Sequence, residues 1–283
     1  MLRRNSITTI ALATALTMGT LASVPARADD AAKYPDWKGQ WVGIGADAPD
    51  APWDPGKPGG AAQQAPLTPE YQGIYQATLA RHASGVKEPT TCLPPGMPRT
   101  MLMYEPMEII VMPDTTYLMI TYMSEFRRIF TDGRKWPEDI EPSYAGYSIG
   151  HWVDESKDGH YNVLEVETRG LKGPRTFDAS GLPLHQDNET VVKERIYLDK
   201  NDLNLLHDEV TTLDHALTRP WTVIRSYYRD PNPVWSEFVC SEDNHQVMLG
   251  KENYLISDQG YLSPTRPGQP APDLKYFKQP AKK

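Results

Sequence analysis

The sequence predicts a mainly β protein: an antiparallel meander that forms a closed or nearly closed barrel, with one N-terminal helix. Three observations support this fold class. After Met107 the apolar residues alternate with a period of two, tight turn signals separate the short runs, and no strand–helix–strand rhythm or glycine-rich phosphate loop occurs. A nucleotide-binding α/β fold is therefore not expected.

The first 28 residues have the pattern of a secretory signal peptide. Arg3 and Arg4 precede a mostly apolar stretch over residues 7–24, and a small-x-small tripeptide ends at Ala28. We expect cleavage near Ala28 and a periplasmic or secreted mature protein; a membrane anchor is the alternative. No later stretch is apolar enough to cross a bilayer, so no stable membrane insertion is expected.

Residues 29–90 are expected to hold a short aromatic strand, a loop and a helix. The strand begins near Trp37, and residues 48–66 are too rich in Pro, Gly and Ala for a regular element. A helix is predicted over residues 69–83, because Thr68 can cap it and Pro69 suits its first position. Its apolar stripe is formed by Tyr71, Ile74, Tyr75 and Leu79.

The barrel is expected over residues 91–262, followed by a flexible tail over 263–283. Turn residues such as Asp132-Gly133 and Asp158-Gly159 separate the strand-like runs. The predicted strands are 107–112, 117–122, 125–131, 147–154, 161–168, 189–198, 203–212, 221–229 and 234–240. A short helix is expected after Cys240.

Charge and cysteine content restrict the function classes. The formal net charge is −8 and no basic block occurs, so nucleic acid is not an expected partner. Cys92 and Cys240 are predicted to form a disulfide in an exported chain; two buried free thiols are the alternative. A CxxC redox motif and zinc-type Cys/His spacings are absent.

Several predicted strands carry a charge on an otherwise apolar face. Because strand residues alternate between faces, one of the tandem residues Arg127 and Arg128 is expected to point into the barrel. Arg225, Glu194 and Glu237 have the same kind of position on their strands. Buried charges must pair, hydrogen-bond or face a wet cavity, so these groups either brace the barrel (or sit outside it) or line a ligand site.

The sequence supplies side chains for acid–base chemistry without a cofactor. We expect a proton-transfer set composed of His185, Tyr147, Glu194 and Arg127. The residues expected to contact a ligand are Arg99, Glu125, Arg128, Arg134, Tyr144, His151, Arg225, Tyr227 and Glu237. No metal site is predicted, because His207-Asp208 and Asp214-His215 lack HxH or HExxH spacing, and no Gly-x-Ser-x-Gly motif indicates a serine hydrolase.

A series of short motifs resembles a family of exported bacterial proteins, most of which have no assigned function. The motifs include CLPPGMPR at 92–99, FRRIFTDGR at 126–134, GYSIGHW at 146–152 and TRPW at 218–221. This chain departs from the family pattern at 153–155, where Val-Asp-Glu replaces Glu-Gly-Asp, and at 183–187, where Pro-Leu-His-Gln-Asp replaces Pro-His-Ser-Asp. Gly39-Gln40-Trp41 also resembles the Gly-x-Trp opening of lipocalin-like barrels, in which the Trp closes one barrel end.

Together these features favour an exported protein with an aromatic-lined pocket for a hydrophobic or aromatic small molecule. The 15 Tyr and 7 Trp residues are sufficient to line such a pocket. A cofactor-independent lyase or isomerase is the leading hypothesis. A non-catalytic carrier with the same pocket and a structural protein of the cell envelope are the alternatives.

Overall fold

The computed structural model describes residues 32–44, 64–83, 92–102, 105–173, 175–178, 180–240, 246–249, 252–256 and 262–265. The expected signal peptide, most of the loop at 48–66 and the tail beyond residue 265 lie outside these residues. Within the described ranges, no helix combines the length and apolar character needed to span a membrane.

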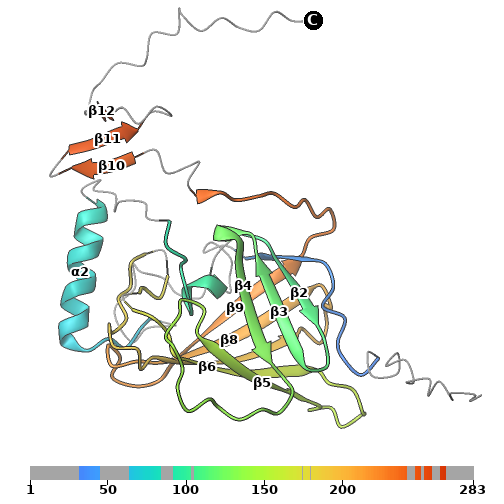
Figure 1. Cartoon of the computed structure of the whole chain (residues 1–283). Helices are drawn as coiled ribbons and strands as arrows, with labels where there is room; N and C mark the ends of the chain where they lie inside the picture. Colours follow the sequence, from blue (N-terminus) through green and yellow to red (C-terminus); the bar gives the residue numbers. More distant parts are fainter. Residues whose placement is uncertain are drawn as a thin grey trace, which may run out of the picture.

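Nine strands form a closed barrel, which confirms the predicted fold class (Figure 1). Alternating buried and partly exposed residues along the strands place one face of each strand inside the barrel. The strands are β1 (Gln40–Gly43), β2 (Met107–Val111), β3 (Thr115–Ile120), β4 (Glu125–Phe130), β5 (Tyr147–Val153), β6 (Val163–Arg169), β7 (Val191–Leu198), β8 (Leu205–Leu213) and β9 (Trp221–Arg229).

The barrel departs from a purely antiparallel meander at one place. β4 and β5 pair in parallel, with Ile129 opposite Ser148, whereas every other pair of neighbours is antiparallel. The N-terminal strand β1 pairs with both β2 and β9, so it closes the barrel although it precedes the expected domain boundary at residue 91.

The strand predicted at residues 234–240 does not form. β1 already occupies the edge of β9, so no backbone ladder is left for a further strand there. The Gln40 side chain instead donates to the Val234 carbonyl oxygen at 3.1 Å and accepts from the Val234 amide at 3.3 Å. Glu237 and Trp235 are exposed on this irregular segment.

The N-terminal helix α2 (Pro69–Ala83) forms at the predicted residues. The Tyr71 amide donates to Thr68 Oγ1 at 3.4 Å, which is the predicted capping interaction. The buried stripe is narrower than expected: Tyr75 is buried, whereas Ile74 is 45% exposed. The Tyr75 hydroxyl lies 3.0 Å from Ser180 Oγ, which connects the helix to the loop between β6 and β7.

The short helix expected directly after Cys240 falls on residues 241–245, which lie outside the described residues. The described residues beyond them form a separate sheet of three strands: β10 (Gln246–Leu249), β11 (Glu252–Ile256) and β12 (Leu262–Thr265). β12 includes residues that were assigned to the flexible tail.

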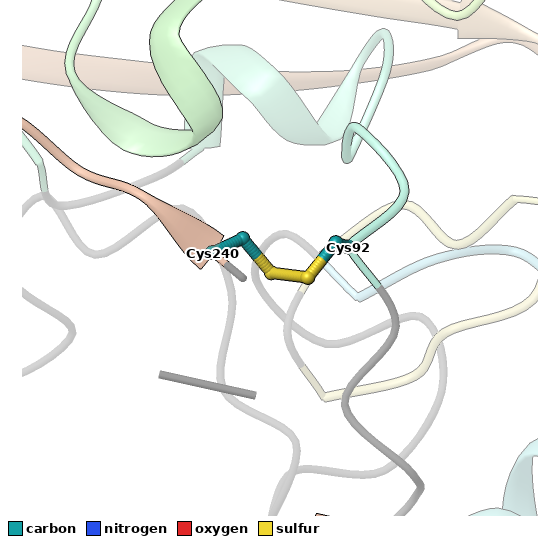
Figure 2. The surroundings of a disulfide bond; sticks show 2 residues. All are labelled: Cys92 and Cys240. Carbon is teal, nitrogen blue, oxygen red and sulfur yellow. A yellow bond between two sulfur atoms is a disulfide. The ribbon is translucent and has the colours of Figure 1, made fainter. Parts of the chain in front are cut away.

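The predicted disulfide between Cys92 and Cys240 is confirmed (Figure 2). It joins the segment that precedes β2 to the segment that follows β9, across a sequence separation of 148 residues. Such a bond is consistent with folding in an oxidising compartment.

Both ends of the barrel are covered. At one end the fully buried Trp41 lies under the guanidinium of Arg229, whose carbon is 4.4 Å from the ring centroid. At the other end the segment of residues 96–102, which includes the 3-10 helix η1 (Arg99–Leu102), packs against inward-facing residues. We call residues 96–102 the plug segment.

Candidate functional site

The tandem arginines take opposite faces of β4. Arg127 points into the barrel and is 2% exposed, whereas Arg128 is exposed, with its guanidinium carbon 5.4 Å from the centroid of the Tyr117 ring. The strand alternation that predicted one inward arginine therefore selects Arg127.

Arg127 uses all three guanidinium nitrogens inside the barrel. Nη1 donates to Glu194 Oε1 at 2.7 Å, and Nη2 donates to Glu194 Oε2. Nη2 also donates to Thr168 Oγ1 at 2.9 Å, and Nε lies 3.4 Å from Ser148 Oγ. This fork-to-fork pair is the strong form of an arginine–carboxylate interaction. Burial disfavours the charged guanidinium, but the charge of Glu194 outweighs it and raises the pKa of Arg127.

A second carboxyl group, that of Asp208, lies beside Glu194. Asp208 is fully buried, and neither of its oxygens accepts a bond from an N–H or hydroxyl group of the described residues. Burial, and then the negative charge of Glu194, raise the pKa of Asp208 well above its ordinary range. In its neutral form, Asp208 can donate a hydrogen bond to the neighbouring Glu194 side chain.

Two side chains of β9 complete this group. Arg225 is the register partner of Asp208, and its guanidinium carbon lies 5.9 Å from the centroid of the Tyr227 ring. Burial, followed by the nearby Asp208, raises the pKa of Tyr227 well above its ordinary value. The Tyr227 hydroxyl donates to the carbonyl oxygen of Met101 in the plug segment. We call Arg127, Glu194, Asp208, Arg225 and Tyr227 the lumen cluster.

The lumen is filled by side chains rather than open. Every member of the lumen cluster is at most 2% exposed. Met97 and Met101 of the plug segment are each 1% exposed, and Thr100 of the same segment donates to Glu125 Oε2 at 2.6 Å. The inward charges were expected around a hollow, but in this conformation they contact one another and the plug segment.

The structure brings together only two of the four residues of the expected proton-transfer set. Arg127 and Glu194 are bonded to each other inside the barrel. Tyr147 precedes the inward-facing Ser148 and lies on the outer face, where its ring is 5.1 Å from that of Phe130. His185 lies on the loop between β6 and β7, where its Nδ1 is 2.7 Å from Asp187 Oδ2.

The residues expected to contact a ligand are also divided. Arg225 and Tyr227 belong to the lumen cluster, and Arg99 and Glu125 lie at the plug segment. The Tyr144 carbonyl oxygen accepts the Met97 amide at 2.9 Å, so Tyr144 supports the plug segment. The remaining four residues are exposed on the outside: Arg128, Arg134, His151 and Glu237.

A cleft with a volume of about 1000 Å³ lies on the outer wall of the barrel. Its apolar surface comes from Val163, Leu198 and Leu203, and Leu203 is 65% exposed. Tyr197 is its one aromatic residue, so the cleft is less aromatic than the expected pocket. We call it the wall cleft; it is lined by residues 35–36, 155–156, 162–163, 195, 197–200, 203–204, 209 and 229.

The polar groups of the wall cleft are held in place. The Tyr197 hydroxyl donates to Glu209 Oε1 at 2.8 Å, and Arg195 Nη1 donates to Glu209 Oε2 at 3.3 Å. Burial, and then the bond to Glu209, raise the pKa of Tyr197 to about 12, so its phenol stays neutral. Arg229 Nη2 donates to the Asp36 carbonyl oxygen at 2.8 Å and fixes the N-terminal rim.

Sequence reasoning missed Asp208 as a member of the inner cluster and missed the wall cleft. A signal for Asp208 was present, because Leu206, Asp208 and Val210 share the inward face of β8. Asp208 had been considered only together with its neighbour His207, which faces the other side. No local signal indicates the wall cleft, because its lining comes from segments that the fold brings together.

No protein-family model matches this chain, and no curated protein matches it. The family resemblances of the sequence therefore stay predictions, and the functional argument depends on the geometry.

Proposed function

We propose that this protein is an exported binding protein for a small hydrophobic or aromatic molecule, which it holds in the wall cleft. The cleft volume of about 1000 Å³ carries the proposal, because it lies at the upper end of the usual range for ligand pockets. The lumen, by contrast, is occupied by the protein's own side chains.

The lining suggests what such a ligand carries. The exposed side chain of Leu203 and the Tyr197 ring offer apolar contact, and the fixed Tyr197–Glu209 pair offers oxygen acceptors to a polar group. Four acidic and three basic residues line the cleft: Asp36, Glu155, Asp199 and Glu209 with Arg195, Lys200 and Arg229. We therefore expect an uncharged or weakly cationic compound with one polar group at the edge of an apolar body.

A panel of aromatic and aliphatic compounds, screened by ligand-detected NMR with the mature protein, tests the proposal. Tyr197→Ala and Leu203→Ser are each expected to weaken binding of any hit roughly tenfold, since each removes a main apolar contact. Leu249→Ser on β10 is the matched control, because Leu249 is also a half-exposed leucine but lies outside the cleft. Binding that survives both cleft variants unchanged would exclude this location.

A second candidate function is cofactor-independent proton transfer in the lumen, as in a lyase or isomerase. The two buried carboxyl groups inside the barrel favour it: burial raises the pKa of Asp208 well above its ordinary value, so Asp208 is available as an acid beside Glu194 and Arg127. The inward hydroxyls of Thr116 and Thr212 also lack a hydrogen-bond partner among the described residues. Substrate entry would require the plug segment to move.

Turnover assays with the same panel separate the two functions. If the lumen is catalytic, Glu194→Gln abolishes product formation while the cleft variants spare it. If the protein is a carrier, the wild-type protein binds a compound and releases it unchanged. Product formation that is insensitive to Glu194→Gln would contradict the lumen mechanism.

A further inference from the structure

Three potential metal ligands meet on the outside of the barrel, away from the wall cleft. His185, Asp187 and His215 each offer one ligand atom, and these atoms lie within 4.8 Å of one another. We call them the His–Asp–His trio. His185 and Asp187 lie on the loop between β6 and β7, and His215 lies on the turn between β8 and β9.

Both imidazole rings approach the same carboxylate oxygen. Asp187 Oδ2 lies 2.7 Å from His185 Nδ1 and 2.6 Å from His215 Nδ1. The other oxygen, Oδ1, accepts the backbone amide of Glu189 at 3.2 Å, which orients the carboxylate toward the two rings. Contacts this short require a hydrogen atom or a metal ion between nitrogen and oxygen. A single cation between the three atoms replaces both protons.

The backbone on both sides of the trio is fixed by one carboxylate. Asp214 Oδ1 accepts the amide of His185 at 2.9 Å and the amide of Ala216 at 2.8 Å. The loop that carries His185 and the turn that carries His215 are therefore held together without any bound ion. Preorganisation of this kind lowers the cost of placing ligands around a metal.

The donor set and the accessibility are suitable for a borderline transition metal. Two imidazoles and one carboxylate are ligands for Zn²⁺ and leave a coordination position open. The side chains of His185, Asp187 and His215 are 36%, 26% and 62% exposed, so an ion can enter from solvent.

We propose that the His–Asp–His trio binds one Zn²⁺ ion and thereby links the β6–β7 loop to the β8–β9 turn. Zinc ligands at about 2.0–2.1 Å in tetrahedral geometry are about 3.3 Å apart, so the side chains must separate by roughly 0.7 Å. The exposed side chains can rotate by this amount. Glu189 offers a further carboxylate, since its Oε2 lies 3.8 Å from His215 Nε2. The proposal is independent of small-molecule binding in the wall cleft.

Isothermal titration of the mature protein with ZnCl₂ tests the proposal; the protein carries no histidine tag. We expect one site per chain, and we expect His185→Ala and His215→Ala each to weaken zinc binding at least tenfold. His151→Ala is the matched control: His151 Nε2 lies 2.9 Å from Glu165 Oε2, but among the described residues this pair is not part of a group of three potential metal ligands. Its zinc affinity should equal that of the wild type.

A second readout does not depend on calorimetry. Saturating Zn²⁺ should raise the thermal unfolding midpoint of the wild type and of His151→Ala, but not that of His215→Ala. Circular dichroism checks that His215→Ala is folded, which the exposure of this side chain leads us to expect. Absence of saturable zinc binding, or equal affinity in His215→Ala and wild type, would overturn the proposal.

Discussion

Replacement of Arg127 by methionine tests whether the lumen cluster stabilises the barrel. The substitution removes the cation that holds Glu194 and also removes its bonds to Thr168 and Ser148. Breaking a buried ion pair by deleting one partner costs about 3–5 kcal/mol, because the remaining charge stays buried without compensation. For a chain of this size, that loss corresponds to a drop in Tm of roughly 6–20 °C.

The neighbouring arginine supplies the control. Arg128→Met removes the same chemical group one residue away, but on the exposed face of β4. Surface substitutions of this kind change the free energy of unfolding by about 0.5 kcal/mol or less. The tandem arginines therefore separate the effect of burial from the effect of composition.

Urea unfolding followed by tryptophan fluorescence measures both variants and the double variant Arg127→Met/Glu194→Gln. The double variant no longer buries a carboxylate without a cation, so it should recover part of the loss caused by Arg127→Met. A loss below about 1 kcal/mol, or a double variant no better than the single one, would refute the assignment of this pair as a stabilising contact.

Three further predictions follow from the structure. Because burial and the charge of Glu194 raise the pKa of Asp208 well above its ordinary value, its contribution to stability is present at low pH and is lost as the pH rises through the folded pKa. Asp208→Asn should therefore gain urea resistance relative to wild type as the pH rises above the ordinary range of aspartate, and parallel curves would contradict this. Replacement of Cys92 and Cys240 by serine should lower the free energy of unfolding by about 5 kcal/mol in the chain-entropy estimate for this separation, and an unchanged urea midpoint would show that the bond is not stabilising. Gly146→Ala should destabilise the protein more than Gly133→Ala in thermal melts, although both residues have positive φ. A Cβ at Gly146 would lie 2.5 Å from Leu171 Cδ2, whereas a Cβ at Gly133 meets nothing within 4 Å. Equal losses of stability in the two variants would argue against this packing.

Much of the barrel could be predicted from local patterns. The helix at 69–83 formed at the predicted residues because capping by Thr68 and the first-position Pro69 are local effects. The strand at 221–229 was also predicted with its observed bounds, and Trp221, Val223, Arg225 and Tyr227 on its one face are all buried. The pattern at 234–240 looked equally strand-like, but a strand needs an unpaired neighbour, and β1 had taken that edge.

The candidate sites were less accessible to sequence reasoning. The alternation rule placed Arg225, Tyr227 and Glu194 on inward faces, but it could not state that the plug segment would fill the space between them. The His–Asp–His trio was missed because metal motifs are recognised by short spacings, whereas His185 and His215 come from a loop and a turn that Asp214 brings together. The wall cleft likewise depends on the contact between the N-terminal segment and the β7–β8 turn.

The amino-acid sequence by itself determined the class of the fold, the helix, most strand positions and the pairing of Cys92 with Cys240. These features follow from periodicity, capping, turn chemistry and the number of cysteines, which depend on near neighbours in the chain or on composition. Only the tertiary structure decided that β1 closes the barrel and that Arg127 rather than Arg128 is buried. It also decided that Asp208 is buried inside the barrel near Glu194. These outcomes depend on strand register and on contacts between side chains that are distant in the chain. Such contacts contribute to the free energy of folding only once the barrel has closed.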